Sequence, residues 1–164
     1  MLITFLPRCR RDGDITLRPL RISDGPSLSR ILEQEDILRS GSRRRLRRTH
    51  WIFIYFWLRR TFFAAYCIEH RAETIGFVGL HNLVPGESAE ISLVLFDPAG
   101  RRRGYGTRAF KLLCGNSFTI SFADTLIARV RNDNGPARSF WTSLEFVTVR
   151  DYGDTIVMEL RRGK

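Results

Sequence analysis

Lysine is nearly missing from this chain of 164 residues. Lys111 and Lys164 are its only lysines, although lysine and arginine together number 27. Arginine therefore carries almost all of the positive charge behind a formal net charge of +10. Such a balance suits nucleic acid, a ribosomal surface, anionic lipid or a polyphosphate ligand, and it does not choose between them. A genomic base composition that favours arginine over lysine would give the same bias.

Cysteine is also scarce. Cys9, Cys67 and Cys114 are far apart and form no Cys-x-x-Cys pair, which excludes a disulfide framework and a zinc site of the usual spacing. Cys114 falls in a helix-like segment with no base visible beside it, so we expect a core position rather than a nucleophile. The histidines are equally scattered, and we expect no metal site from them: His50, His70 and His81.

The chain lacks a hydrophobic run long enough to cross a membrane. Its most apolar window, Trp51 to Leu58, is far shorter than the roughly 20 residues of a spanning helix. The apolar start, Met1 to Pro7, is too short for a secretory signal, and basic residues follow it instead of preceding it. With an ordinary hydrophobic content of 43%, we expect one soluble, cytoplasmic domain over residues 1–164.

The spacing of apolar residues predicts an alternation of strands and helices. Strands are predicted over Ile15–Leu20, Phe62–Ile68, Thr74–Leu80, Ala89–Phe96, Thr125–Arg131, Phe146–Arg150 and Thr155–Leu160. Helices are predicted from Ser23 or Asp24 to Arg39, over Arg43–Arg60, over Thr107–Phe118, and from Asn134-Gly135-Pro136 onward. Pro19 favours an edge position for the first strand, and turn-like segments make the three strands between residues 62 and 96 consecutive and antiparallel.

The stretch from Arg101 to Thr107 links a predicted strand to a predicted helix and contains Gly104 and Gly106. Two glycines separated by one residue allow a tight turn and a close backbone approach, while the first N–H groups of a helix favour an anion. The loop has neither the Gly-Lys-Ser/Thr of a P-loop nor the third glycine of a dinucleotide fingerprint, since Ala109 stands there. A phosphate ligand of another kind is predicted.

The predicted helix 43–60 begins with five arginines over positions 43–48 and continues as a block of aromatic residues. Basic and aromatic side chains together are typical of single-stranded nucleic acid binding. The aromatics form one block instead of being interleaved with the charges, which suits a buried helix or a dimer surface equally. Both interpretations stay open.

The order of these elements resembles the GNAT superfamily of acetyl-CoA-dependent N-acetyltransferases. Arg101, Gly104 and Gly106 match its pyrophosphate motif, Gln or Arg-x-x-Gly-x-Gly or Ala after the fourth strand. Its later Asn-x-x-Ala-x-x-x-Tyr-x-x-x-Gly-Phe pattern is matched in part by Asn134, Ala137, Leu144 and Phe146. The segments 15–24 and 74–80 are most similar to the branch that contains the ribosomal-protein and nucleotide-aminosugar acetyltransferases. The likeness covers residues 14–160.

The resemblance implies an α+β, three-layer acyl-CoA N-acyltransferase fold, with a central mixed, mostly antiparallel sheet of six to seven strands and about four flanking helices. It also implies acetyl-CoA as co-substrate: backbone groups of residues 94–96 would pair with the pantetheine arm, and amides of residues 102–107 would hold the pyrophosphate. The implied cofactor-binding residues are Val94, Leu95, Phe96, Arg101, Arg102, Arg103, Gly104, Tyr105, Gly106, Thr107, Asn134 and Trp141. Asn134 is as readily a simple helix cap.

Glu90 lies at the start of the fourth strand of the resemblance, where several members place the carboxylate that deprotonates the amine, and it is the candidate general base. Trp141 occupies the position of the family tyrosine that protonates the thiolate, and an indole N–H is a poor acid. We therefore name Tyr152 as the candidate acid, with Tyr105 or water as alternatives. Glu145 replaces the family glycine before Phe146, so that turn is either changed or strained.

Two classes of function follow. The first is an N-acetyltransferase that moves the acetyl group of acetyl-CoA to a primary amine by direct attack in a ternary complex, the amine belonging to a protein N-terminus or a small molecule. The second is a weakly catalytic binding module of the same fold that holds RNA or another polyanion on its basic segment 43–48. A homodimer and contact with the ribosome are compatible with both.

Overall fold

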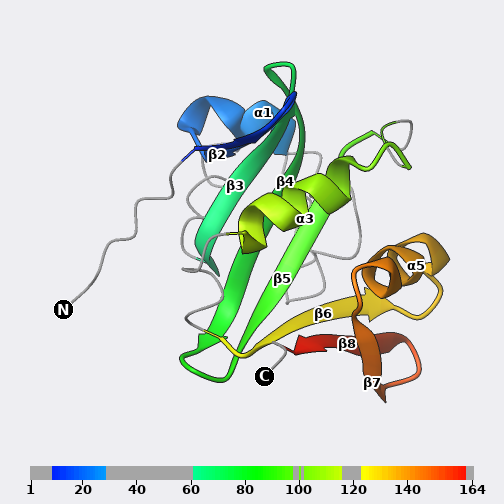
Figure 1. Cartoon of the computed structure of the whole chain (residues 1–164). Helices are drawn as coiled ribbons and strands as arrows, with labels where there is room; N and C mark the ends of the chain where they lie inside the picture. Colours follow the sequence, from blue (N-terminus) through cyan, green and yellow to red (C-terminus); the bar gives the residue numbers. More distant parts are fainter. Residues whose placement is uncertain (1–8, 29–60, 98–99, 101, 116–122, 162–164) are drawn as a thin grey trace.

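In the described part of the chain, a mixed sheet of eight strands in the order β1-β2-β3-β4-β5-β6-β8-β7 organises the fold (Figure 1). The computed structural model describes residues 9–28, 61–97, 100, 102–115 and 123–161. Its strands are β1 (Arg10–Asp12), β2 (Ile15–Pro19), β3 (Phe62–His70), β4 (Glu73–Val84), β5 (Ser88–Leu95), β6 (Thr125–Arg131), β7 (Val147–Asp151) and β8 (Thr155–Arg161). Its helices are the 3-10 turn η1 (Ile22–Asp24), α1 (Gly25–Leu28), α3 (Tyr105–Cys114) and α5 (Gly135–Ser143).

The predicted strands are all present, and three of them, β3, β4 and β5, form the expected antiparallel series. Two details were wrong. The sheet has eight strands rather than six or seven, because the short β1 pairs with the first predicted strand. That strand, β2, is consequently not at the edge: β1 pairs with Ile15 to Leu17, and Pro19 lies beyond it, opposite Tyr66 of β3 alone. The missing N–H of Pro19 therefore costs no hydrogen bond with β1.

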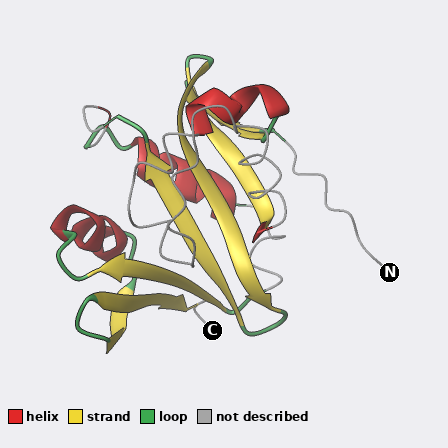
Figure 2. Ribbon diagram, turned by 180° about the vertical axis from the view of Figure 1, so that it is seen from behind, coloured by secondary structure: helices red, strands yellow, loops and turns green. Residues whose placement is uncertain are grey.

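Two hydrophobic clusters lie on opposite faces of the sheet. The larger one packs α3 and α5 against alternate residues of the strands, including Val78, Ile91 and Ala128. The smaller one gathers Leu28 of α1 with Phe77 and other residues of the opposite face. The two opposed views agree, because α3 lies in front of the sheet in Figure 1 and behind it in Figure 2. Period-two alternation along each strand produces this division.

Other predictions fall outside the described residues: the first helix beyond Leu28, the whole helix 43–60 with its basic segment 43–48, and the end of the third helix beyond Gly115. Over the part of the chain that is described, no helix combines the length and the apolar character that crossing a membrane requires.

A buried ion pair connects the 3-10 turn η1 to strand β2. The guanidinium of Arg18 on β2 donates to both carboxylate oxygens of Asp24, at 2.7 and 2.8 Å, and to Glu69 on β3 at 2.6 Å. Arg18 and Asp24 are 8% and 6% exposed. Asp24 also accepts the backbone N–H of Arg21 at 2.6 Å and so caps η1. The Cys67 thiol donates to the same carboxylate at 3.4 Å, and burial raises the pKa of that thiol.

The end of α5 shows how Glu145 replaces the family glycine. Glu145 has a left-handed backbone, with φ of 68°. The Glu145 N–H donates to the Thr142 carbonyl, and the Phe146 N–H donates to the Trp141 carbonyl. The ring centroids of Phe146 and Trp141 lie 4.8 Å apart. This is a Schellman motif with its hydrophobic contact, whose left-handed position is usually glycine. The turn is therefore kept, and Glu145 carries the strain.

Replacing Glu145 by glycine is expected to stabilise the protein by about 1 kcal/mol, because the left-handed conformation costs a residue with a Cβ about that much. Urea unfolding at pH 7 measures the difference. The matched control is Glu145→Ala, which removes the same charge but keeps the Cβ and should not gain stability. Equal stabilisation by both variants would show that charge, not backbone strain, is the cause.

Candidate functional site

Strands β5 and β6 separate part-way along their length, and this opening organises the site. They pair in parallel over only three residues of each strand, from Ser88 to Glu90 against Thr125 to Ile127. Beyond that point β5 stays paired with β4 as far as Leu95, whereas β6 continues to Arg131 against β8. Figure 1 shows the two strands diverging from a common end. The diverging halves leave one side of the second half of β5 without its neighbouring strand.

The backbone groups on that side of β5 belong to alternate residues. The N–H of Thr125 bonds the carbonyl of Glu87, so the odd-numbered residues face β6. The N–H of Phe96 donates to Ile75 at 2.9 Å, so the even-numbered residues face β4. By this alternation Leu93 and Leu95 face the opening. Of the residues predicted for backbone contacts, Phe96 donates its N–H to the β4 ladder, and by the same alternation the backbone groups of Val94 belong to that ladder, whereas those of Leu95 point away from β4.

The glycine loop lies where β5 leads into α3. Gly104 is left-handed, with φ of 75°, and is the N-cap of α3 without any side-chain cap, while Arg102 before it also has a positive φ of 63°. The first intrahelical bond of the loop is from the Arg108 N–H to the Gly104 carbonyl, so the N–H groups of the first turn have no partner within the helix. Arg101 lies outside the described residues. Arg102 and Arg103 are exposed.

Gly106 fixes the position of this first turn. A Cβ there would lie 3.1 and 3.3 Å from ring carbons of Phe140 on α5 and 3.5 Å from Leu93 on β5. The start of α3 is thus pressed between α5 and the part of β5 that has left β6. Its N–H groups and its helix dipole favour an anion next to the opening.

Acidic residues of β1 and of the turn between β1 and β2 hold α3 in this place. Arg108 donates to Asp12, at 2.9 Å from Nε, and to Asp14, at 2.7 Å from Nη1. Asp14 in turn contacts Nε2 of His70 at 2.8 Å. The Arg108 hydrogen bond, opposed by burial, keeps the pKa of Asp14 below its usual value. The hydroxyl of Tyr105 lies 3.4 Å from the same His70 nitrogen, and the two rings stack with centroids 4.7 Å apart. Tyr105, an alternative acid, therefore faces His70.

Glu90 lies at the point where the strands separate. It is the last residue of β5 that pairs with β6, and its side chain is 12% exposed. Arg129 of β6 contacts Oε1 of Glu90 twice, at 3.1 Å from Nε and 3.0 Å from Nη2. This hydrogen bond raises the pKa of Arg129. The candidate base is therefore a carboxylate held in an ion pair across the closed end of the opening.

Two polar residues that the sequence did not identify lie beside Glu90. His81 of β4 is directly opposite Glu90 in the antiparallel register. Its Nε2 is 3.2 Å from Oγ of Ser92, the next residue of β5 on the Glu90 face. Burial lowers the pKa of His81, an effect that Glu90 opposes. The alternation of β5 would have placed Ser92 with Glu90, but the position of His81 depends on the β4 register, which periodicity does not determine.

The remaining predicted residues are spread around the opening. Tyr152 is 59% exposed in the β7–β8 turn, and its hydroxyl accepts from Arg150 at 3.4 Å. Trp141 is 6% exposed and belongs to the larger core cluster. The carbonyl oxygen of the Asn134 side chain caps α5 by accepting the Ala137 N–H at 3.1 Å. Thr107 lies in the first turn of α3. The structure does not bring Tyr152 into contact with Glu90.

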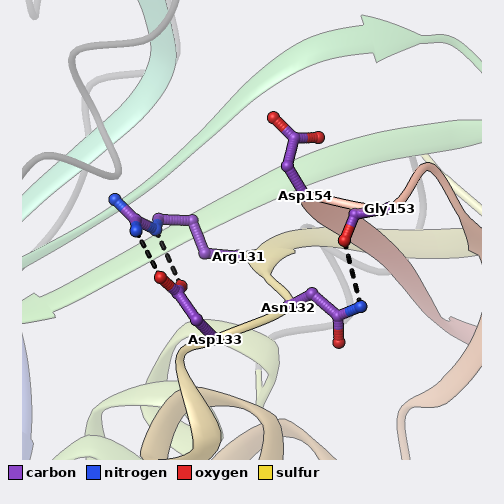
Figure 3. A pocket seen from close by; sticks show the side chains of 5 residues that line it. All are labelled: Arg131, Asn132, Asp133, Gly153 and Asp154. Carbon is purple, nitrogen blue, oxygen red and sulfur yellow. Dashed lines mark hydrogen bonds and ion pairs between the residues drawn. The ribbon is translucent and has the colours of Figure 1, made fainter.

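A polar pocket of about 370 Å³ lies between the end of β6 and the β7–β8 turn (Figure 3). Its lining residues are Arg131, Asn132, Asp133, Gly153 and Asp154. Asn132 donates to the Gly153 carbonyl at 3.1 Å, which ties the two turns together, and Arg131 donates to Asp133 at 2.8 Å. Gly153 and Asp154, which line the pocket, follow Tyr152 in the β7–β8 turn. The described residues include no cluster of three metal-ligating side chains.

A family model described as an acetyltransferase (GNAT) domain matches residues 14–147. The chain belongs to the GNAT acetyltransferase family. This confirms the family named from the glycine loop and the order of elements, together with the predicted fold class. No curated protein matches the sequence significantly.

Solved structures of GNAT enzymes share the fold at low sequence identity. RimJ of Mycobacterium smegmatis in complex with a CoA disulfide is 21% identical, with a TM-score of 0.75 over 96% of this chain and 88% of that one. An acetyltransferase of Salmonella typhimurium that modifies the N-terminal serine of ribosomal protein L7/L12 is 16% identical, with a TM-score of 0.71 over 95% and 100%. The protein yncA of the same organism, solved with its cofactor acetyl-CoA, is 15% identical, with a TM-score of 0.67 over 91% and 94%.

Proposed function

We propose that this GNAT protein transfers the acetyl group of acetyl-CoA to a primary amine by direct attack of the amine. The observation that carries the proposal is the pairing of a helix start held by Gly104 and Gly106 with a strand edge that opens beside it. The helix start suits a pyrophosphate, and the open strand edge suits an extended arm that contains amides. Coenzyme A has these two parts next to each other.

The residues present fit this donor. The N–H groups at the start of α3 would hold the pyrophosphate. The positive charges of Arg102 and Arg103 would attract the phosphates without fixing their position. The backbone of Leu93 would bond a pantetheine amide as an extra strand does. When bound, acetyl-CoA supplies an activated thioester, so the protein has to align the amine with it and remove a proton.

Direct attack is favoured over a covalent acetyl-cysteine. Burial raises the pKa of the Cys114 thiol to about 12, and burial raises the pKa of the Cys67 thiol as well. Both thiols are therefore protonated at neutral pH, and the thiolate is the nucleophilic form. A ternary complex needs no such intermediate.

The acceptor is proposed as a primary amine, with protein N-termini first to be tried. Several fold neighbours are described as ribosomal-protein acetyltransferases, including a ribosomal L7/L12 alpha-N-protein acetyltransferase and a ribosomal-protein-S5-alanine acetyltransferase. The test is calorimetric titration with acetyl-CoA, followed by measurement of CoA release over a panel of N-terminal peptides, amino sugars and polyamines. Binding with turnover of one amine is expected. Absence of acetyl-CoA binding would overturn the proposal, and binding without turnover would favour the binding module.

Glu90→Gln is expected to lower kcat/KM about 10- to 100-fold while leaving acetyl-CoA affinity unchanged, because Glu90 promotes loss of the amine proton and does not contact the donor loop. The measurement combines steady-state kinetics with calorimetry. Glu87→Gln, at an exposed residue of the β4–β5 turn, is the matched control and should keep the full rate. An unchanged rate in Glu90→Gln would remove Glu90 from the mechanism.

A further inference from the structure

We propose that His81 accepts the proton of the acceptor amine through the hydroxyl of Ser92, and that Glu90 stabilises the charged imidazole. This inference rests on the proposed acetyl transfer and names the group at which the proton arrives. It is distinct from a mechanism in which Glu90 itself is the base.

The first support is position. Glu90 and Ser92 project from one face of β5, and His81 lies opposite Glu90 on β4. Ser92 belongs to the half of β5 that has left β6, so it lies nearer to the opening than Glu90 does. The hydrogen bond of 3.2 Å between Ser92 Oγ and His81 Nε2 connects that opening to the imidazole. A proton released at the opening can therefore pass to the Ser92 hydroxyl and from it to the His81 imidazole.

The second support is the way His81 is held. Its ring packs edge-on against Phe62, with centroids 4.9 Å apart. Asn82 has a left-handed φ of 49°, and the β4–β5 register shifts between His81 and Val84. A bulge of this kind redirects the neighbouring side chain, and backbone strain in a non-glycine residue is commonly found at functional sites.

The third support is the charge around the ring. The polar groups that act on the His81 ring are Glu90 of β5, Arg129 of β6 and the neighbouring Asn82 of β4. Burial and Arg129 lower the pKa of His81, and Glu90 and Asn82 act against them. Because the pKa of His81 is lowered overall, its imidazole is neutral at pH 7 and able to accept a proton. Glu90 already pairs with Arg129, so its carboxylate is suited to stabilise a charge beside it.

The proton balance is complete. In the tautomer whose Nε2 is unprotonated, the Ser92 hydroxyl donates to His81. The ammonium group gives one proton to Ser92 Oγ as Ser92 gives its own to His81. The neutral amine then attacks the thioester carbonyl, the C–N bond forms, and the C–S bond breaks. The second nitrogen proton passes to the leaving thiolate, and His81 returns its proton to solvent.

The decisive measurement is an NMR titration of histidine-labelled protein, because it does not depend on turnover. The His81 pKa is expected below 6.5, and Glu90→Gln should lower it further by removing the opposing negative charge. A His81 pKa at or above 6.5, or one that Glu90→Gln leaves unchanged, would overturn the inference even if acetyl transfer is established. If acetyl-CoA fails to bind, the proposed function falls separately.

Kinetics test the role itself. His81→Gln is expected to lower kcat/KM about 10²- to 10⁴-fold and to abolish the limb of the pH profile below 6.5, with acetyl-CoA affinity unchanged. Ser92→Ala should lower the rate and keep that limb, and Glu90→Gln should move it to lower pH. The control is Ser88→Ala, on the same face of β5. The proposed proton transfer through Ser92 to His81 is refuted if His81→Gln keeps the limb of the pH profile below 6.5, or if Ser92→Ala keeps the full rate. If His81→Gln does not fold, Ser92→Ala and the NMR titration test the proposal.

Discussion

Replacing Asp24 by asparagine is expected to lower the free energy of unfolding by about 3 to 5 kcal/mol, the usual cost of breaking a buried ion pair from one side. Asp24 accepts two hydrogen bonds from Arg18 and one from the Arg21 backbone, and both charged side chains are less than 10% exposed. Asparagine has nearly the same shape as aspartate but no charge, so Glu69 alone remains as the carboxylate partner of Arg18. Urea unfolding at pH 7 measures the loss.

The effect of Asp24→Asn should depend on pH. Burial acts to raise the pKa of Asp24, but the hydrogen bonds from Arg18 and Arg21 outweigh it, so the folded-state pKa is below the ordinary value of 3.8. A carboxylate with a lowered pKa contributes stability that is fully present above the unfolded-state pKa and is lost as pH falls through the folded one. The difference between wild type and Asp24→Asn should therefore shrink below about pH 4. A difference that stays constant in acid would show that the charge of Asp24 is not its cause.

A double variant separates the ion pair from packing. Arg18→Met alone leaves two carboxylates, Asp24 and Glu69, without their cation, and is expected to be as destabilising as Asp24→Asn. Replacing both members, in Arg18→Met with Asp24→Leu, should recover part of the loss, since a buried pair is often no better than apolar groups of the same volume. Additive losses would mean that the two residues stabilise the fold independently.

The sequence predicted the backbone geometry of the glycine loop better than the surroundings of Glu90. Gly104, Gly106 and the helix after them are local features: a left-handed turn and a close contact each require glycine at a fixed position, and helix periodicity gives the rest. The same locality identified Glu145 as a position where the turn is either changed or strained, because a helix end usually has a left-handed glycine there. The left-handed backbone of Glu145 decides between these two alternatives in favour of strain.

The surroundings of Glu90 depend on relations between strands, which periodicity does not contain. Glu90 was identified by resemblance, but its Arg129 partner comes from β6, and His81 from a β4 register set partly by a bulge. The Arg18 and Asp24 pair shows the same limit: both lie in a segment quoted for its family likeness, yet their pairing appears only once β2 and η1 are folded together. The β1 strand, three residues long, was too short to give a periodic signal.

Replacing Gly106 by valine is expected to weaken acetyl-CoA binding about 10- to 100-fold, corresponding to the loss of one N–H bond to a charged phosphate. A Cβ at Gly106 already lies 3.1 Å from the Phe140 ring, so the two γ-methyls of valine cannot be placed without moving the start of α3 from α5. The N–H groups that would hold the pyrophosphate move with it. Calorimetry measures the affinity, and kcat/KM should fall about 100-fold, as for a shift of about 1 Å in a bound substrate.

The chain offers a matched control and a rescue for this prediction. Gly135→Val places the same side chain in the first turn of α5, where a Cβ meets nothing within 4 Å, and should leave acetyl-CoA affinity unchanged. Gly106→Ala should be intermediate, because its Cβ needs only a few tenths of an ångström from Phe140. Phe140→Ala makes room for the valine methyls, so combining it with Gly106→Val should restore most of the affinity. If Phe140→Ala does not rescue Gly106→Val, then close packing against α5 is not what positions the loop, and the glycine serves the backbone alone.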